Sequence, residues 1–486
     1  MTERELLART AELAADYLET LDTRSVGAAR DYRGMLAALD RPLPEGPSDP
    51  LEVVEQLVRD AGDGLVAMGS GRYFGFVIGG ALPSSTAVDW LASAWDQNTG
   101  LAEVTPAVSA LEAIAGRWVL ELLGLPARSS FAFVTGCQMA HVTCLAAARH
   151  GVYRRAGWDL PEHGLAGAPP LRVVVGDKRH VTVTRALRLL GIGREQEITL
   201  PVDREGRMDV SQLPDALEPS VPTIVCVQAG EVNTGAFDDI EAAIEAASGT
   251  DAWVHVDGAF GLWAATVPSL RHLLAGYERA DSWATDAHKW LNVPYDCGIA
   301  ICAHPADHEA AMEYAAPYLD VSEHAAIRDP MGYSPEFSRR ARSAPVWAAI
   351  RELGRSGVAD LIERTCAHAR RFAERIAGLP GCEVLNEVVL NQVLFRFADD
   401  EQTRAALASV QASGEAWMSG TVWDGSAAIR LSVSNWRTTE ADVDRTVAAF
   451  ARALGMQRVS DLKVGHLTST ATRRPPACRR RARRSR

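Results

Sequence analysis

Residues 281–298 read DSWATDAHKWLNVPYDCG and place Lys289 between a histidine and a tryptophan in a largely apolar run. A lysine normally keeps its ammonium group in water. In such a run it therefore either extends its charged end to the surface or is used chemically. The segments on either side of this stretch distinguish the two interpretations.

Short apolar runs alternate with helical stretches between about residues 85 and 300. The runs are rich in β-branched residues and end at turn residues; they read FAFVT (131–135), LRVVVG (171–176), TIVCVQAG (223–230), AWVHVD (252–257) and CGIAIC (297–302). Nearly continuous apolar strands separated by helices are typical of a sheet that is buried on both faces and mostly parallel. The sequence therefore predicts an α/β fold.

The two ends of the chain follow other patterns. The first 70 residues predict helices with a break at RPLPEGPSDP, where Ser48 or Asp49 can cap a helix that starts at Pro50. Residues 337–376 predict a long helical connection, after which NQVLFRFA and AIRLSVSN predict shorter strands of an α+β unit. We therefore expect four parts: an N-terminal helical arm (1–75), a large α/β domain (76–345), a smaller C-terminal α+β domain (346–458) and a basic tail (459–486).

Composition describes an ordinary acidic protein of 486 residues, with 47% hydrophobic and 23% charged residues and a formal net charge of −12. This charge gives no overall attraction to nucleic acid, and no apolar stretch reaches the length of a membrane span. Residues 473–486 differ, because they carry eight arginines and two prolines. A contact with nucleic acid or a membrane surface is one interpretation of this tail. We expect a disordered, solvated extension, and no nucleic-acid or membrane partner.

Eight cysteines are scattered along the chain without a spacing typical of metal ligands. Most lie in apolar runs, where a thiol packs as a small hydrophobic group. We therefore expect no metal site and a reducing, cytoplasmic location.

Polar residues follow several of the predicted strands, and ligands of open α/β sheets bind where parallel strands end. Gly136, Cys137 and Gln138 open a helix directly after FAFVT, and amides at a helix N-terminus can bind a phosphate. Asp257 ends AWVHVD, where a buried carboxylate needs a cationic or hydrogen-bonding partner. Burial of Lys289 would lower the pKa of its amine and make it a usable nucleophile.

Each of these features also has an ordinary structural interpretation, as a strand-to-helix turn, a helix cap or a lysine that reaches the surface. Together they supply what pyridoxal phosphate needs. A lysine binds this cofactor covalently, a carboxylate keeps its pyridine nitrogen protonated, and backbone amides hold its phosphate. The combination favours a chemical use of Lys289.

The segments HVDGAFGLWA and DSWATDAHKWLNVPYDCG closely resemble the group II pyridoxal-phosphate-dependent amino-acid decarboxylases, the family of the aromatic L-amino acid and glutamate decarboxylases. The resemblance spans roughly residues 70–455. It implies the aspartate-aminotransferase fold (PLP fold type I), a homodimer, and removal of the α-carboxylate of an L-amino acid to give an amine and CO2. It also implies that Lys289 holds the cofactor, that Asp257 pairs with the pyridinium nitrogen and that Ala259 contacts the ring.

The same resemblance assigns further residues. DKRHVTVTRALRLLG resembles the segment whose histidine, here His180, stacks on the ring, and His288 resembles the histidine on the phosphate side. The family carries a mobile loop with a tyrosine that protonates the substrate carbon across a dimer interface. Tyr318 lies where that tyrosine is expected, and Tyr333 is the nearby alternative. Arg430 lies where relatives of the fold keep an arginine that binds a carboxylate.

Departures from the family pattern leave the substrate open. The phosphate loop reads TGCQMAH, where the family usually has Ser/Thr-Gly-Gly-Ser/Thr-Glu-Ala-Asn. Glu231 and Asp286 add acids that would repel a phosphate unless they are turned away or paired, so neither is expected to be a ligand. Three alternatives remain: oxidative deamination to an aldehyde coupled to decarboxylation, transamination, and a binding or regulatory subunit that has lost activity.

Overall fold

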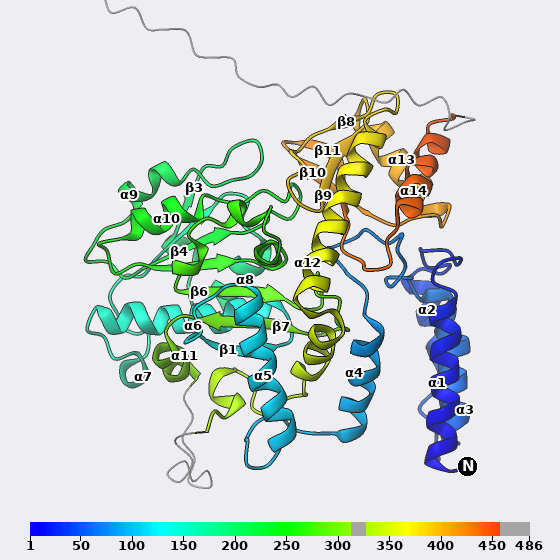
Figure 1. Cartoon of the computed structure of the whole chain (residues 1–486), viewed down its shortest axis with the longest axis horizontal. Coiled ribbons are helices and arrows are strands. Elements are labelled where there is room, and N and C mark those ends of the chain that lie inside the picture. The colour runs from blue at the N-terminus through cyan, green and yellow to red at the C-terminus, as the bar shows by residue number, and fades with distance from the viewer. Residues whose placement is uncertain (313–326, 457–486) are drawn as a thin grey trace, which may run out of the picture.

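The computed structural model describes residues 1–312 and 327–456. These residues form a large α/β domain, a smaller domain with its own sheet, and a helical arm (Figure 1).

Seven strands form the sheet of the large domain, in the order β1-β7-β6-β5-β4-β2-β3. They are β1 (Ser130–Val134), β2 (Arg172–Gly176), β3 (Glu197–Leu200), β4 (Thr223–Gln228), β5 (Trp253–Asp257), β6 (Ser282–Asp286) and β7 (Gly298–Cys302). All run parallel except β7, which pairs antiparallel with β1 and β6. The predicted α/β class with a mostly parallel sheet is confirmed.

Both faces of this sheet are buried. In β2, Val173 and Val175 belong to a core on one side that also contains residues of α6 and α8, whereas Val174 belongs to the core on the other side, which contains residues of α5, α10 and α12. This explains the continuous apolar runs, since neither face of the strand meets water. Two strands were not predicted. β3 reads EITL and is half-buried, and β6 reads SWATD, whose polar residues are buried.

The helices of the large domain are α4 (Pro83–Trp95), α5 (Pro106–Leu122), α6 (Cys137–Arg155), α7 (Leu160–His163), α8 (Val181–Leu189), α9 (Leu213–Ala216), α10 (Ile240–Ala247) and α11 (Pro305–Met312). Short 3-10 turns lie at Gly62–Gly64, Arg194–Gln196, Val210–Gln212, Gly261–Thr266, Arg271–Leu274, Tyr277–Arg279 and Pro330–Tyr333. α12 (Ser343–Ile376) packs on α4 and α5 and continues into the smaller domain (Figure 1). It is kinked at Gly354, whose φ of 61° is not helical.

The smaller domain has an antiparallel sheet in the order β10-β11-β9-β8. Its strands are β8 (Glu383–Val384), β9 (Gln392–Arg396), β10 (Ser419–Trp423) and β11 (Ser426–Ser432), and its helices are α13 (Asp400–Ala412) and α14 (Glu440–Ala453). Buried aromatic rings of Phe372, Phe395, Phe397 and Phe450 fill its core together with aliphatic side chains.

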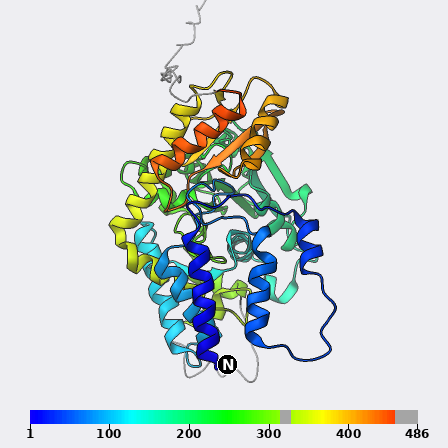
Figure 2. The ribbon, with the colours of Figure 1, turned by 90° about the vertical axis from the view of Figure 1, so that its right-hand side faces the viewer.

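The N-terminal arm consists of α1 (Glu3–Glu19), α2 (Tyr32–Leu39) and α3 (Pro50–Ala61), which lie along one side of the body (Figure 2). Asp49 caps α3 by accepting hydrogen bonds from the amides of Leu51 and Glu52, as one of the two predicted caps. None of the three helices contains a buried residue. Within the described ranges, no helix is long and apolar enough to cross a membrane.

Candidate active site

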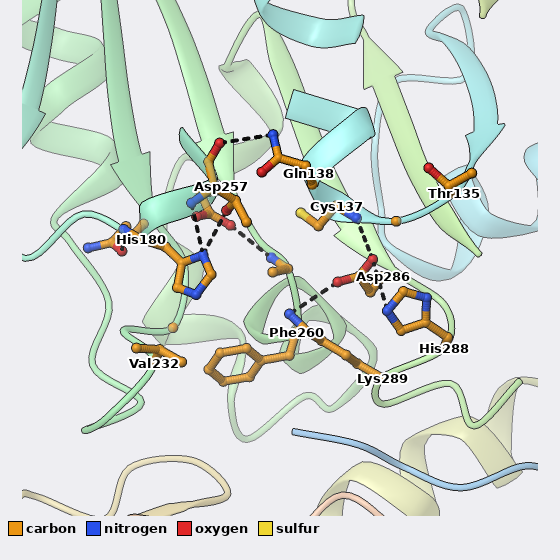
Figure 3. Close-up of a pocket in the computed structure, with 15 residues that line it drawn as sticks. Thr135, Cys137, Gln138, His180, Val232, Asp257, Phe260, Asp286, His288 and Lys289 are labelled. Carbon is orange, nitrogen blue, oxygen red and sulfur yellow. Dashed lines mark hydrogen bonds and ion pairs between the residues drawn. The ribbon is translucent and has the colours of Figure 1, made fainter. Parts of the chain in front are cut away.

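A cavity of about 270 Å³ opens where β1, β4, β5 and β6 end (Figure 3). All eight residues predicted to contact the cofactor line it, namely Gly136, Cys137, Gln138, His180, Asp257, Ala259, His288 and Lys289. The parallel strands bring them together from segments more than 150 positions apart, because the strand ends share one edge of the sheet.

Asp257 ends β5 and is buried, with 5% of the residue exposed. Its Oδ1 accepts a hydrogen bond from the amide of Ala259 at 3.2 Å and lies 3.5 Å from Nε2 of His141. Burial by itself would raise the pKa of this carboxyl, but His141, His180 and Lys289 hold the pKa well below its ordinary value. In the described part of the chain, no donor reaches Oδ2. A charged carboxylate oxygen is therefore available to a cationic N–H group.

Lys289 lies in the turn between β6 and β7, and its Nζ forms an ion pair with Oδ2 of Asp286 at 3.1 Å. Burial favours a lower pKa for this amine, but the attraction of Asp286 outweighs it, so the pKa of Lys289 is raised. The expectation of a lowered pKa is wrong for this structure, because it considered burial without the neighbouring carboxylate.

Asn292 fastens the turn that carries Lys289. This buried residue adopts a left-handed φ of 56°. Its Nδ2 donates to the carbonyl of Ser434 at 3.0 Å, and its Oδ1 accepts from the amide of Trp436 at 2.9 Å. A side chain at Gly79 would overlap the carbonyl oxygen of Lys289 and the side-chain amide of Asn292. The position of the lysine backbone thus depends on the smaller domain and on the segment before α4.

Asp286 occupies part of the expected phosphate seat. Its Oδ1 accepts a hydrogen bond from the amide of Cys137, at the start of α6, at 2.6 Å. The carboxylate is paired, as expected, but it lines the cavity and is not turned away. The expectation that Asp286 is not a phosphate ligand did not foresee its ion pair with Lys289.

The imidazole of His288 lies beside the carboxylate of Asp286. Its Nδ1 accepts from the amide of Cys297 at 3.0 Å, so the hydrogen of the neutral ring sits on Nε2, which lies 3.5 Å from Oδ1 of Asp286. Burial lowers the pKa of His288 and favours this neutral form. The ring thus presents one N–H donor to the cavity next to Gly136, where there is no side chain to block it.

His180 caps α8 and lies across the cavity from Lys289 (Figure 3). Its amide donates to Oε1 of Gln228 at 3.1 Å, and its Nδ1 lies 2.7 Å from the hydroxyl of Thr182. Burial lowers the pKa of His180 to about 4, so the ring is neutral near pH 7. Gln228 and Thr182 also line the cavity and were not predicted. Gln228 ends β4, so the strand-end rule applied to TIVCVQ would have found it.

The residues of the cavity fit pyridoxal phosphate. A lysine amine, an ionised carboxylate with an unpaired oxygen, a neutral imidazole and an N–H donor beside a glycine surround one space. In that order, these groups match four parts of the cofactor: its carbonyl, its protonated ring nitrogen, a face of its ring and an oxygen of its phosphate. The fit is tighter at the ring nitrogen than at the phosphate, where Asp286 already uses one amide.

Two further residues are Arg430 and Glu231. Arg430 in β11 is half-buried, its Nε has no hydrogen-bond partner in the part of the chain that the structure describes, and its guanidinium lies 5.8 Å from the ring of Phe76. Burial lowers its pKa, and Glu231 opposes that shift. Glu231 is paired, as expected, because it accepts hydrogen bonds from the amides of Asn233 at 2.6 Å and Thr234 at 2.8 Å.

Of the two tyrosines considered as proton donors, Tyr318 lies outside the described residues. Tyr333 packs against the ring of His308 at 5.4 Å and is not part of the cavity lining.

Comparison with known proteins gives one family and several full-length relatives. A family model described as "Pyridoxal-dependent decarboxylase conserved domain" matches residues 34–398. The chain is 26% identical over 468 residues to aromatic-L-amino-acid decarboxylase of Bacillus atrophaeus, which covers 90% of this chain and 93% of that protein. It is 28% identical over 361 residues to 4-hydroxyphenylacetaldehyde synthase of Rhodiola rosea, covering 70% of this chain and 72% of that protein. A solved structure of Oryza sativa TDC with PLP and tryptamine superposes with a TM-score of 0.87 at 24% identity, over 93% of this chain and 97% of that one.

Proposed function

Because the chain belongs to the pyridoxal-dependent decarboxylase family, we propose that its cavity removes the α-carboxylate of an L-amino acid and releases an amine and CO2. Carboxy-lyase activity and the use of pyridoxal 5'-phosphate follow from membership of the family. The roles of individual residues are our proposal. It rests mainly on one observation, that the amine of Lys289 and the charged carboxylate of Asp257 line the same cavity.

We assign cofactor binding to the eight residues that line the cavity as predicted. Lys289 would hold the cofactor covalently, Asp257 would pair with its ring nitrogen, and His180 and Ala259 would lie against its ring. The N–H of His288 and the start of α6, at Gly136, Cys137 and Gln138, would bind its phosphate. When bound, the cofactor supplies a conjugated ring that accepts the electron pair of the bond that breaks.

The protein's own part in the reaction is orientation and proton control. Arg430, with an unpaired Nε and a half-buried guanidinium, suits an amino-acid carboxylate, which an arginine binds through two parallel hydrogen bonds. Asp257 stays charged and so stabilises a proton on the group that it contacts. Lys289, with its raised pKa, carries a proton that it can deliver to the substrate carbon after CO2 leaves. Tyr318 is the second proposed proton donor, on the resemblance described above.

Oxidative deamination to an aldehyde is the second candidate, because a relative of this chain is an aldehyde synthase. The two outcomes differ in the fate of the substrate carbon: a proton gives the amine, whereas oxidation by dissolved dioxygen followed by hydrolysis gives the aldehyde, ammonia and hydrogen peroxide. The test is to incubate the purified protein and cofactor with each common L-amino acid in turn. We expect at least one of them to give CO2 and the matching amine in equal amounts. Aldehyde with hydrogen peroxide would favour the second candidate, and no CO2 from any amino acid would contradict both.

We also propose a homodimer held together by the N-terminal arm. α1, α2 and α3 expose large apolar side chains, among them Leu7 at 58%, Leu36 at 52%, Val53 at 52% and Leu57 at 59%. Helices without buried residues need a partner surface to stabilise them, and a second copy of the chain supplies one. Sedimentation of the full chain should give a dimer and Leu57→Glu a monomer, with Val181→Glu, at an exposed apolar residue outside the arm, as control. A monomeric wild-type protein would contradict the proposal.

A cytoplasmic location is the last part of the proposal. It is supported by the seven cysteines of the described residues, all of which are free thiols and six of which are buried. Fractionation of cells that express the protein should place it with the cytoplasmic fraction; recovery outside that fraction would contradict this.

A further inference from the structure

Behind Asp257, on the side away from the cavity, a row of buried polar side chains runs through the domain. Nε2 of His141 faces Oδ1 of Asp257 at 3.5 Å, and Nδ1 of His141 lies 3.0 Å from Nε2 of His255. Nδ1 of His255 lies 2.9 Å from Oγ of Ser282, which accepts a hydrogen bond from Nε1 of Trp253 at 2.8 Å. All of these residues are at most 5% exposed.

The two ends of this row fix where its hydrogens lie. An ionised carboxylate only accepts hydrogen bonds, so the approach of Nε2 of His141 to Asp257 at 3.5 Å is favourable when this nitrogen carries a hydrogen. The indole of Trp253 only donates, so Oγ of Ser282 accepts from it and has one hydrogen left to give. If Ser282 donates to His255, then His255 donates to His141 and His141 donates to Asp257. Every buried donor and acceptor is then satisfied with both imidazoles neutral.

The opposite arrangement leaves a buried group without a partner. A doubly protonated His141 would donate to His255, which would in turn donate to Ser282. The hydroxyl hydrogen of Ser282 would then need an acceptor, and none lies within reach among the described residues. An unsatisfied buried hydroxyl is unfavourable, because the group loses its hydrogen bonds to water and gains none in return. Burial also lowers the pKa of His255 to about 3, in keeping with a neutral ring.

We propose that Ser282, His255 and His141 form a one-way hydrogen-bond relay that ends on Asp257, and that His141 is a positioning residue for this carboxylate. The relay holds His141 as a neutral donor. It fixes the orientation of the carboxylate and leaves Oδ2 for the ring nitrogen of the cofactor. The role toward the cofactor rests on the proposed function, whereas the positions of the hydrogens do not.

Cys137 does not change this assignment. Its Sγ lies 3.4 Å from Nε2 of His141, and the ligand atoms of Cys137, His141 and Asp257 all lie within 4.8 Å of one another. Burial and the nearby carboxylates raise the pKa of the thiol well above its usual value, so it stays protonated. A neutral thiol next to an imidazole N–H is a weak acceptor and leaves the carboxylate as the stronger one.

Solid-state 15N NMR of the full chain with 15N-labelled histidine tests the hydrogen positions directly, in the apoprotein and in the holoprotein. We expect His141 and His255 each to be protonated at Nε2 and bare at Nδ1, with assignments from His141→Gln and His255→Gln. A doubly protonated His141, or either ring protonated at Nδ1 alone, would overturn the relay.

The role toward the cofactor is tested with His141→Leu and His141→Gln. Glutamine can place an N–H donor near the position of the imidazole Nε2, and leucine cannot. We expect His141→Leu to bind pyridoxal phosphate about tenfold more weakly, because the charged carboxylate loses a hydrogen-bond donor, and His141→Gln to restore most of the affinity. In the leucine variant, the 15N shift of ring-labelled cofactor should move toward an unprotonated nitrogen.

His308→Leu is the matched control. This fully buried histidine makes two hydrogen bonds of its own, to Ser130 and Tyr333, outside the cavity. It should keep the wild-type affinity and 15N shift. Wild-type affinity and shift in His141→Leu would overturn the positioning role. If Asp257→Ala also left both unchanged, the proposed function itself would fail, while the NMR result on the relay would stand.

Discussion

The ammonium group of Lys289 lies 3.1 Å from the carboxylate of Asp286, three positions earlier in the chain. This ion pair raises the pKa of the amine that we assign to the cofactor. A protonated amine does not attack a carbonyl, so Asp286 controls the pH range in which the cofactor can be bound covalently.

Asp286→Asn should therefore shift the reaction of the apoprotein with pyridoxal phosphate to lower pH. Without the negative charge the pKa of Lys289 falls, and each unit of that fall increases the unprotonated fraction about tenfold at a pH below the pKa. The measurement is the rate of covalent cofactor binding between pH 6 and 9. Asp296→Asn, an exposed acid in the same turn, should leave the profile unchanged. An unchanged profile in Asp286→Asn would show that the ion pair does not set the reactivity of Lys289.

Asp257→Ala should lower the decarboxylation rate by about 100-fold or more, because a preorganised charge at the reacting centre is lost. Cofactor affinity should fall as well. The rate is measured as released CO2, and the affinity for the cofactor by equilibrium dialysis. A rate close to wild type would assign the stabilisation of the ring nitrogen to another group.

Substitution of Asn292 should separate two contributions to stability. Asn292→Gly and Asn292→Ala both lose the hydrogen bonds to Ser434 and Trp436, at a cost of about 2–3 kcal/mol for two buried bonds. Alanine also has to adopt the left-handed φ of 56°, which costs it about 1 kcal/mol more than glycine. Urea unfolding of the two variants measures the difference. Equal stability, or a more stable alanine variant, would contradict this account of the turn.

His308 should contribute a pH-dependent loss of stability below neutral pH. Burial lowers its folded pKa to about 4, against about 6.5 in the unfolded chain. Between these values the unfolded state binds a proton that the folded state does not, so stability falls as the pH drops from about 6.5 to about 4, by about 3 kcal/mol in total. His308→Gln should lose less stability than wild type over this range in urea unfolding. An identical pH dependence would show that His308 is not the group responsible.

Much of the site could be predicted because strand ends converge. Asp257 and Cys137 each follow an apolar run in the sequence, and the parallel sheet brings them together. β6 was not predicted because SWATD contains polar residues whose hydrogen-bond partners lie far away in the sequence. Ser282, for example, pairs with Trp253 and His255. The pKa of Lys289 could not be predicted because it depends on the direction in which Asp286 points. The anchoring of Asn292 to Ser434 joins positions 142 residues apart, which no local pattern indicates.

The central claim is that Lys289 holds the cofactor, and reduction with borohydride tests it most directly. The chain has three lysines, Lys178, Lys289 and Lys463, so peptide mass mapping of the reduced holoprotein gives an unambiguous answer. We predict that the added mass of the reduced cofactor is found on the peptide with Lys289 and is lost in Lys289→Ala. A label on Lys178 or Lys463, or no label on any lysine, would contradict the account.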